Sequence, residues 1–183
     1  MIQFVNTFLK KSNKIGFFIV LLCGILLHFT FHWSGSNQII GLFSAVNEST
    51  WEHMKLLFIP SFVYFLCEYK KYGSSSRDLL TARTLGLLAG LAFIPVSYYT
   101  YPGIIGKSYF AVDIVIFVLS VFLTFSLSSH FLTKPQRLTA LASCLILLTL
   151  LFLFFLFTFF PPHIQMFLDP VHFTYGSVSA LYP

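Results

Sequence analysis

Charged residues are scarce in this sequence, and their scarcity excludes an ordinary soluble domain. Lysine, arginine, aspartate and glutamate make up 9% of the 183 residues, whereas about a quarter is typical of soluble globular domains. Hydrophobic residues make up 57%, aromatic residues 19%, and the mean hydropathy is +0.83. The composition predicts an integral membrane protein with one transmembrane domain over residues 1–183, because about five crossings of ~20 residues use the whole length.

Cysteine is also rare, and the basic residues form no continuous stripe. Cys23, Cys67 and Cys144 each lie inside an apolar run without metal-type spacing, which argues against disulfides and thiolate metal sites. The net charge is +5, but the basic residues stand in pairs and triplets beside the apolar runs. They therefore indicate membrane topology rather than nucleic-acid binding, and we expect no nucleic-acid partner.

The named catalytic motifs are missing as well. The sequence has no HExxH, GxSxG or SxxK motif and no phosphate-binding glycine loop. These absences remove the usual signatures of zinc proteases, serine hydrolases and nucleotide-binding proteins. A catalytic site must therefore be inferred from the places where ionisable residues gather.

Five long apolar segments predict an all-α bundle of about five transmembrane helices. They cover approximately residues 15–33, 49–69, 79–99, 109–127 and 138–160, and the proline-rich segment 161–183 is too interrupted to span. The first segment exceeds the ~7 to 15 residues of a signal-peptide core, so we expect an uncleaved helix, although Ser34-Gly35-Ser36 leaves cleavage open.

Local signals support two of these helices. Ser49 and Glu52 have the spacing of a capping box, which predicts the start of the second helix, and Pro60 should kink it. Gly86 and Gly90 have the small-xxx-small spacing that allows two membrane helices to approach closely.

The lysines and arginines predict the orientation. Nine fall on one side of the predicted helices and two, Lys55 and Lys107, on the other; the nine are Lys10, Lys11, Lys14, Lys70, Lys71, Arg77, Arg83, Lys134 and Arg137. By the positive-inside rule, the N-terminus is cytoplasmic and the C-terminal segment is extracytoplasmic, in a multi-pass protein of the plasma membrane.

Histidines and carboxylates gather at the predicted outer face. They come from four separate segments: His28 and His32, then Glu48, Glu52 and His53, then Asp113, and finally His163, Asp169 and His172. His28 and His32 are spaced i, i+4, which places two imidazoles on one helical face as in half of a metal site. Ionisable groups at membrane depth usually face the bundle interior and pair with a partner.

This concentration favours a shared site for a divalent metal such as zinc. The candidate ligands are His28, His32, His53, Asp113, His163, Asp169 and His172, and the candidate catalytic residues are Glu48, Glu52 and Lys55. These residues also have simpler interpretations. The glutamates favour a helix start, the two histidines of the first helix belong to an aromatic belt, and Lys55 pairs with a glutamate. Asp113 is a structural hydrogen-bonding group, and the histidines of the tail are solvated.

Several stretches resemble an uncharacterised family of small bacterial multi-pass membrane proteins. They are "VNESTWEHMKLLFIP", "TAR" at 81–83, "YTYPGIIG" at 99–106 and "FTFFPPHIQMFLDPVHFTYG" at 157–176, and the Asn-Glu-Ser-x-Trp-Glu-His element is the most specific. A looser similarity is to ceramidase-like transmembrane hydrolases, which bind zinc through histidines and an aspartate near one membrane face. That resemblance implies a membrane-embedded metal hydrolase and assigns no residue.

Three functions remain in competition. The first is a metal-dependent hydrolase or transferase at the extracytoplasmic face that acts on a lipid or other envelope substrate. The second is a proton- or metal-linked transporter, in which the same groups form a relay. The third is a non-enzymatic membrane protein that binds a partner or a lipid. The oligomeric state is left open.

Overall fold

The structure is a computed structural model that describes residues 2–72, 78–134 and 138–177, with residues 2–10 as backbone alone. Within this part every regular element is a helix, and no strand forms. The elements are α1 (Ile2–Trp33), α2 (Gln38–Gly41), α3 (Thr50–Tyr72), α4 (Leu79–Ile105), α5 (Phe110–Leu132), α6 (Ala140–Phe159) and the 3₁₀ turn η2 (Gln165–Phe167). The all-α prediction is confirmed. Arg77, Arg137 and residues 178–183 of the predicted tail lie outside the described part.

Most helices extend beyond their predicted bounds. α1 begins well before residue 15, and α4 continues through Pro102 to Ile105, where Gly106 ends it with a left-handed φ of +86°. Glycine is the residue that adopts this φ without strain, which makes it a common helix terminator. The apolar pattern predicted only the hydrophobic part of each helix, because the polar turns at the ends carry no periodic signal.

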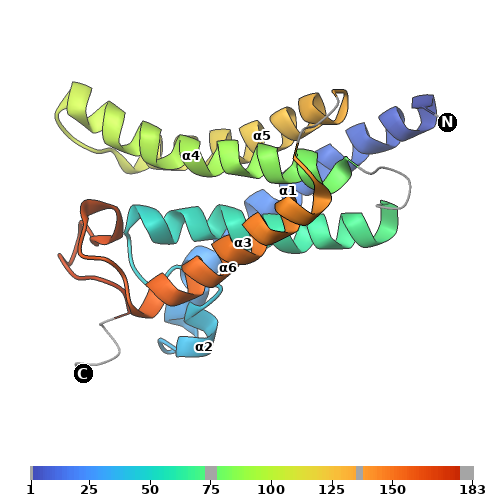
Figure 1. Cartoon of the computed structure of the whole chain (residues 1–183). Coiled ribbons are helices and arrows are strands. Elements are labelled where there is room, and N and C mark those ends of the chain that lie inside the picture. The colour runs from blue at the N-terminus through green and yellow to red at the C-terminus, as the bar shows by residue number, and fades with distance from the viewer. Residues whose placement is uncertain (1, 73–77, 135–137, 178–183) are drawn as a thin grey trace.

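The two ends of the bundle collect different segments (Figure 1). The N-terminus lies at the same end as Tyr72 and Leu79, the last residue of α3 and the first of α4. α2, the connection between α2 and α3, and the segment after α6 lie at the opposite end. This second end is the one that carries most of the predicted site residues.

α3 is the central helix. It contacts α1, α4, α5 and α6, and its side chains are buried along most of its length, including Leu57, Phe58 and Phe65. Its polar residues Glu52, Lys55 and Glu68 are buried as well. Because other helices surround α3, its polar side chains near each end of the bundle lie inside the protein.

Among the described residues, four helices are long and apolar enough to cross a membrane. They are Lys11–Trp33 within α1, together with α4, α5 and α6, at mean hydropathies of 1.7 to 2.8 over their most apolar windows. These helices also expose many large apolar side chains, among them Phe18, Leu22, Phe122 and Phe152. A membrane protein is the class that this combination indicates.

α4 and α5 approach each other closely at the two glycines that the sequence singled out (Figure 1). A Cβ on Gly86 would overlap the Ser128 hydroxyl and the Thr124 carbonyl, and a Cβ on Gly90 would overlap the Thr124 hydroxyl. The predicted small-residue contact is confirmed, and it fixes α4 against α5.

Candidate functional site

Three of the predicted site residues converge at one point. His28 Nε2 lies 3.7 Å from Glu48 Oε1, and His53 Nε2 lies 3.5 Å from Glu48 Oε2. One ligand atom from each residue lies within 4.8 Å of the other two. The two imidazole rings are 5.4 Å apart between centroids. We call these three residues the His-Glu-His triad.

Separate elements supply the triad. His28 lies little more than one turn before the end of α1, Glu48 lies in the connection before α3, and His53 lies in the first turn of α3. The connection is short and held at both ends: Ser44 accepts a hydrogen bond from the Phe31 backbone N–H, and Ser49 accepts one from the Glu52 backbone N–H. The triad is therefore anchored to two helices.

The tautomer of His53 is set by the backbone. Its Nδ1 lies 2.9 Å from the Ser49 carbonyl oxygen, which can only accept a hydrogen bond. Nδ1 therefore carries the proton, and Nε2, which faces Glu48, has the free lone pair in the neutral ring. A carbonyl that orients a metal-binding histidine through its other nitrogen is the usual outer-shell arrangement.

The triad is accessible but not fully exposed. The side chains of His28, Glu48 and His53 are 23%, 41% and 33% exposed. His28 packs edge-on against Phe29, and its Nδ1 is buried without a hydrogen-bond partner among the described residues. The partial exposure of all three side chains leaves the triad open to a small molecule or an ion.

The residue types of the triad suit a divalent metal, and its spacing is wider than that of a filled site. Ligand atoms that bind zinc tetrahedrally at ~2.0 to 2.1 Å lie ~3.3 Å from one another. The triad atoms lie within 4.8 Å of one another, and the 3.7 and 3.5 Å distances end on different oxygens of Glu48, so the three side chains would have to draw together around an ion. Two histidines and one carboxylate are a known ligand set for catalytic zinc and for non-haem iron, and both leave coordination positions open.

Glu52 and Lys55 lie outside the triad, in a buried ion pair. Lys55 Nζ is 2.6 Å from Glu52 Oε2, and the Lys55 and Glu52 side chains are 0% and 2% exposed, respectively. Lys55 also donates to the Gly41 carbonyl and to the Thr158 hydroxyl, at 2.8 Å each. This pair joins α2, α3 and α6 and supports the connection that carries Glu48.

The capping box forms only in part. Ser49 caps α3, but Glu52 accepts from the Val46 backbone N–H at 3.0 Å rather than from that of Ser49. The Ser49 N–H donates instead to the side chain of Asn47. The predicted reciprocal bond is therefore wrong, because the Glu52 carboxylate is already committed to Lys55 and to the connection.

His32 and Asp113 are not among the residues that converge in the triad. The His32 ring is exposed and packs against Phe31 of its own helix. Asp113 accepts a 2.6 Å hydrogen bond from the Tyr101 hydroxyl. Spacing i, i+4 brought His28 and His32 to one side of the helix without bringing them to one site.

Asp169 and His172 serve a turn in the segment after α6. The Asp169 carboxylate accepts from His172 Nδ1 at 2.9 Å and from the Val171 N–H at 2.8 Å. Burial alone would raise the pKa of Asp169, but these hydrogen bonds and that of the His172 N–H outweigh burial, so its pKa is lowered. Asp169 is thus a carboxylate that stabilises its own turn.

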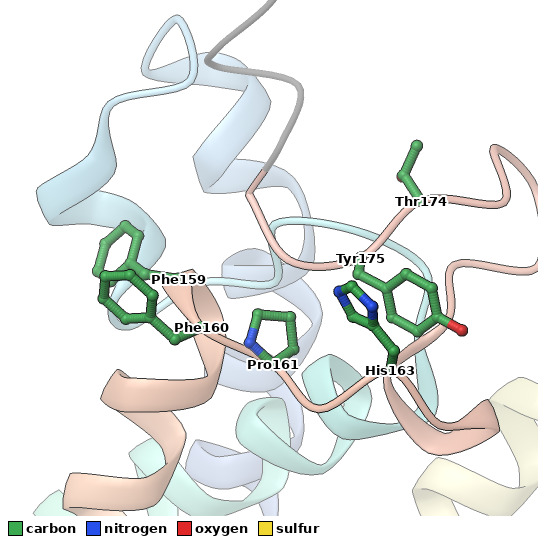
Figure 2. A pocket seen from close by; sticks show the side chains of 6 residues that line it. All are labelled: Phe159, Phe160, Pro161, His163, Thr174 and Tyr175. Carbon is green, nitrogen blue, oxygen red and sulfur yellow. The ribbon is translucent and has the colours of Figure 1, made fainter.

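His163 lines a cavity of about 500 Å³ beneath the same segment, together with Phe159, Phe160, Pro161, Thr174 and Tyr175 (Figure 2). Its ring stacks on that of Tyr175, with centroids 4.6 Å apart. Figure 2 shows the two rings side by side on one wall, with the two phenylalanines on the other. The cavity is mostly aromatic and has one imidazole, so by itself it offers no set of metal ligands.

The segment after α6 also covers the region of the Asn-Glu-Ser-x-Trp-Glu-His element. Asn47 donates to the Gly176 carbonyl at 3.1 Å. Trp51 packs against Phe167 and Phe154, with ring centroids 4.9 and 4.6 Å apart. Asn47, which precedes Glu48, is thereby hydrogen-bonded to a residue 129 positions further along the chain.

A second polar cluster, which sequence reasoning did not assign to a site, lies at the other end of α3. Arg83 donates two hydrogen bonds to Glu68, at 2.6 and 2.7 Å, and Ser12 donates a third at 2.6 Å. Arg83 and Glu68 are buried, and the guanidinium packs over Phe65 and Phe125. The signal available in the sequence was the pair of opposite charges within apolar segments, which are expected to find each other.

The fold and the triad together define an all-helical protein with helices of membrane-spanning length and a possible metal site at one end. The chain belongs to a family of unknown function, DUF6512, whose model matches residues 1–177. No curated protein and no solved structure matches the chain significantly. The membership confirms an uncharacterised family and brings no activity with it.

Proposed function

We propose that the His-Glu-His triad binds a divalent metal ion, zinc by preference, and that the protein is a metal-dependent hydrolase or transferase. The observation that supports this most is the convergence of His28, Glu48 and His53 from two helices and a connection. Independent surface histidines have no reason to meet at one carboxylate with a backbone carbonyl orienting one of them.

The chemistry follows from the open coordination position. Zinc held by three protein ligands lowers the pKa of a bound water to about 7, which supplies a nucleophile at neutral pH. His28, Glu48 and His53 would hold the ion, and the Glu48 carboxylate, whose two oxygens face one histidine each, is the base nearest to the bound water. Glu52 and Lys55 would act by positioning Glu48, because their own charges are satisfied within the buried pair.

The membrane arrangement is part of the proposal. In addition to the four apolar helices, α3 would cross the membrane, with its charged side chains buried inside the bundle. The N-terminus would be cytoplasmic. This places the triad and the segment after α6 at the extracytoplasmic face of the plasma membrane. The excess of lysine and arginine at the opposite end supports this orientation.

A lipid or another envelope molecule is the substrate class that we propose. Phe29 and Trp33, beside His28 on α1, are 44% and 69% exposed, and their rings stack with centroids 5.8 Å apart. Exposed aromatic rings at the end of an apolar helix are typical of the membrane–water interface. A substrate that lies in the bilayer could thus reach the triad laterally.

The transporter alternative has less support. A relay would have to connect the triad with the Glu68–Arg83 cluster, and α3 between them buries Leu57, Phe58 and Phe65. The non-enzymatic alternative predicts ionisable groups spread around the periphery, whereas three of them meet.

Metal content is the first test. The purified full-length protein is stripped with a chelator, reloaded with zinc and measured by mass spectrometry for zinc per chain. We expect about one zinc in the wild type and a loss of at least ten-fold in His28→Ala, Glu48→Gln and His53→Ala. His32→Ala is the matched control, because it removes an exposed histidine one turn away, and it should retain zinc.

Lipid turnover is the second test. Vesicles of phosphatidylethanolamine and phosphatidylglycerol report the release of fatty acids or headgroups by the zinc-loaded protein. We expect turnover in the wild type and in His32→Ala, and none in His53→Ala. Equal zinc in all variants would reject the metal site, and zinc binding without turnover would reject the lipid hydrolase. Zinc uptake into proteoliposomes would favour the transporter.

A further inference from the structure

A cavity of about 370 Å³ lies between α1 and α3 at the end of the bundle opposite the triad. Its size is within the range of small-molecule sites. The lining residues are Lys11, Ser12 and Ile15 of α1, with Tyr64, Cys67, Glu68, Lys71 and Tyr72 of α3. Lys71 follows His53 by 18 residues of one helix, a distance of roughly 27 Å at ~1.5 Å per residue. The outer end of the cavity and the triad are therefore separated by nearly the thickness of a bilayer core.

The polarity of the cavity lining changes with depth along the two helices. Lys11 lies in the exposed polar part of α1, and Lys71 lies in the last turn of α3, so the two cations mark the outer end of the cavity. Ile15 is one turn deeper on α1, and Tyr64 is two turns deeper on α3. A ligand in the cavity would meet positive charge first and then hydroxyl groups and apolar carbon.

The one carboxylate in the lining is already neutralised. Both oxygens of Glu68 are held by Arg83, and one of them also accepts a hydrogen bond from Ser12. Tyr64 donates to the Ser12 carbonyl at 2.7 Å, which fixes the two hydroxyls beside this carboxylate. With Glu68 and Arg83 cancelling each other, the net charge in the lining is that of Lys11 and Lys71. The Lys71 ammonium lies over the ring of Tyr72, another lining residue, 5.2 Å from its centroid.

We propose that this cavity binds the phosphate group of an anionic membrane lipid, with Lys11 and Lys71 as the phosphate contacts. Basic pockets between membrane helices on the cytoplasmic side are a recognised type of headgroup site, and the proposal rests on the orientation proposed above, which puts this end of the bundle on that side. Ile15 and Cys67 are exposed beside the cavity, so acyl chains could leave it along apolar side chains. A free phosphate would leave this apolar part of the lining without a partner.

The proposal does not depend on the metal site. None of the triad residues lines the cavity, and none of the cavity residues is a candidate ligand. Loss of lipid binding would leave zinc content unchanged, and loss of zinc would leave lipid binding unchanged.

Matched charge variants test the proposal. Lys11→Gln/Lys71→Gln removes the two cations that line the cavity, and Lys14→Gln/Lys70→Gln removes two exposed neighbours that do not. Both variants lose the same net charge from the same ends of the same helices. Each is purified as the full-length chain in a neutral detergent, and its folding is checked by size exclusion and circular dichroism.

Binding is measured by native mass spectrometry with three probes: a short-chain phosphatidylglycerol, a short-chain phosphatidylcholine and inorganic phosphate. We expect the wild type and Lys14→Gln/Lys70→Gln to retain phosphatidylglycerol equally. Lys11→Gln/Lys71→Gln should bind it about 30-fold more weakly, since each surface cation contributes about five-fold in affinity for anionic lipid.

Three results would overturn the proposal. Equal weakening in both variants would make the effect one of net charge alone. Phosphatidylcholine binding as strong as phosphatidylglycerol binding would remove the role of the anion. Competition by inorganic phosphate at the concentration at which phosphatidylglycerol binds would identify the cavity as a site for the free ion rather than for a lipid.

Discussion

Lys55 Nζ lies 2.6 Å from Glu52 Oε2, with both side chains almost completely buried between α2, α3 and α6. Removing one member of such a pair leaves the other as an uncompensated buried charge, at a cost of about 3 to 5 kcal/mol. Replacing both members removes the two desolvation penalties together. Comparing single and double variants of the pair therefore distinguishes a structural role from a catalytic one.

We predict that Lys55→Met lowers the free energy of unfolding by about 3 to 5 kcal/mol, and that Glu52→Gln/Lys55→Met lowers it by much less. The amide oxygen that Glu52→Gln introduces could still accept the hydrogen bond of the Val46 N–H. Unfolding is followed by circular dichroism in mixed detergent. If the pair acts by positioning, the double variant keeps zinc and lipid turnover; a folded double variant with zinc but without turnover would assign the pair to catalysis.

The Asn-Glu-Ser-x-Trp-Glu-His element combines several roles in seven residues. Glu48 and His53 belong to the triad, Ser49 caps α3, and Asn47 holds the segment after α6. The remaining members, Trp51 and Glu52, point into the packed interior. The polar residues of this element are thus divided between the triad and the contacts that hold it in place.

The sequence predicted the helices better than it predicted the site. Apolar length and charge asymmetry can be read directly from the linear sequence. They therefore located five helical segments and predicted that most ionisable residues lie at one end of the bundle. Convergence depends on the rotation of each helix about its axis and on where neighbours cover it. His28 and His32 are one turn apart, yet only His28 faces Glu48, and no local pattern in the sequence distinguishes the two.

Tail residues were misleading for a related reason. Asp169 and His172 have the spacing of a helical ligand pair, but they form a hydrogen-bonded turn with each other. Local pairing satisfies polar side chains at less entropic cost than assembly with distant residues. A composition argument counts these residues toward a shared site, whereas the structure gives them a local partner.

The contact between α4 and α5 predicts that glycine-to-alanine substitutions at two positions of α4 change the stability in opposite directions. Gly86→Ala would place a Cβ against the Thr124 backbone carbonyl, which cannot rotate away, so we expect a loss of about 1 to 3 kcal/mol. Gly103→Ala is the control in the same helix, because nothing lies within 4 Å of its added Cβ. There the higher helix propensity of alanine should raise stability by up to ~1 kcal/mol. Thermal unfolding of the two variants in the same detergent measures the difference, and equal shifts would contradict the close approach.

The last prediction concerns acid pH and the segment after α6. The hydrogen bonds that lower the pKa of Asp169 stabilise its charged form in the folded turn. That stabilisation is fully present above the ordinary aspartate pKa of about 4 and is lost as the pH falls through the lower, folded-state pKa. Below pH 4 we therefore expect the turn to loosen, and Phe167 with it to move away from Trp51.

Trp51 reports this loosening once the exposed Trp33 is replaced, in a Trp33→Phe background. The emission of Trp51 should shift to longer wavelength as the pH falls from 6 to 3. Asp169→Asn should show the shifted emission already at pH 6, with no further transition, because its amide cannot ionise. Asp113→Asn removes a carboxylate bonded to Tyr101 rather than to the turn, and should keep the wild-type profile. An acid transition with the same midpoint in Asp169→Asn would show that another group controls the segment.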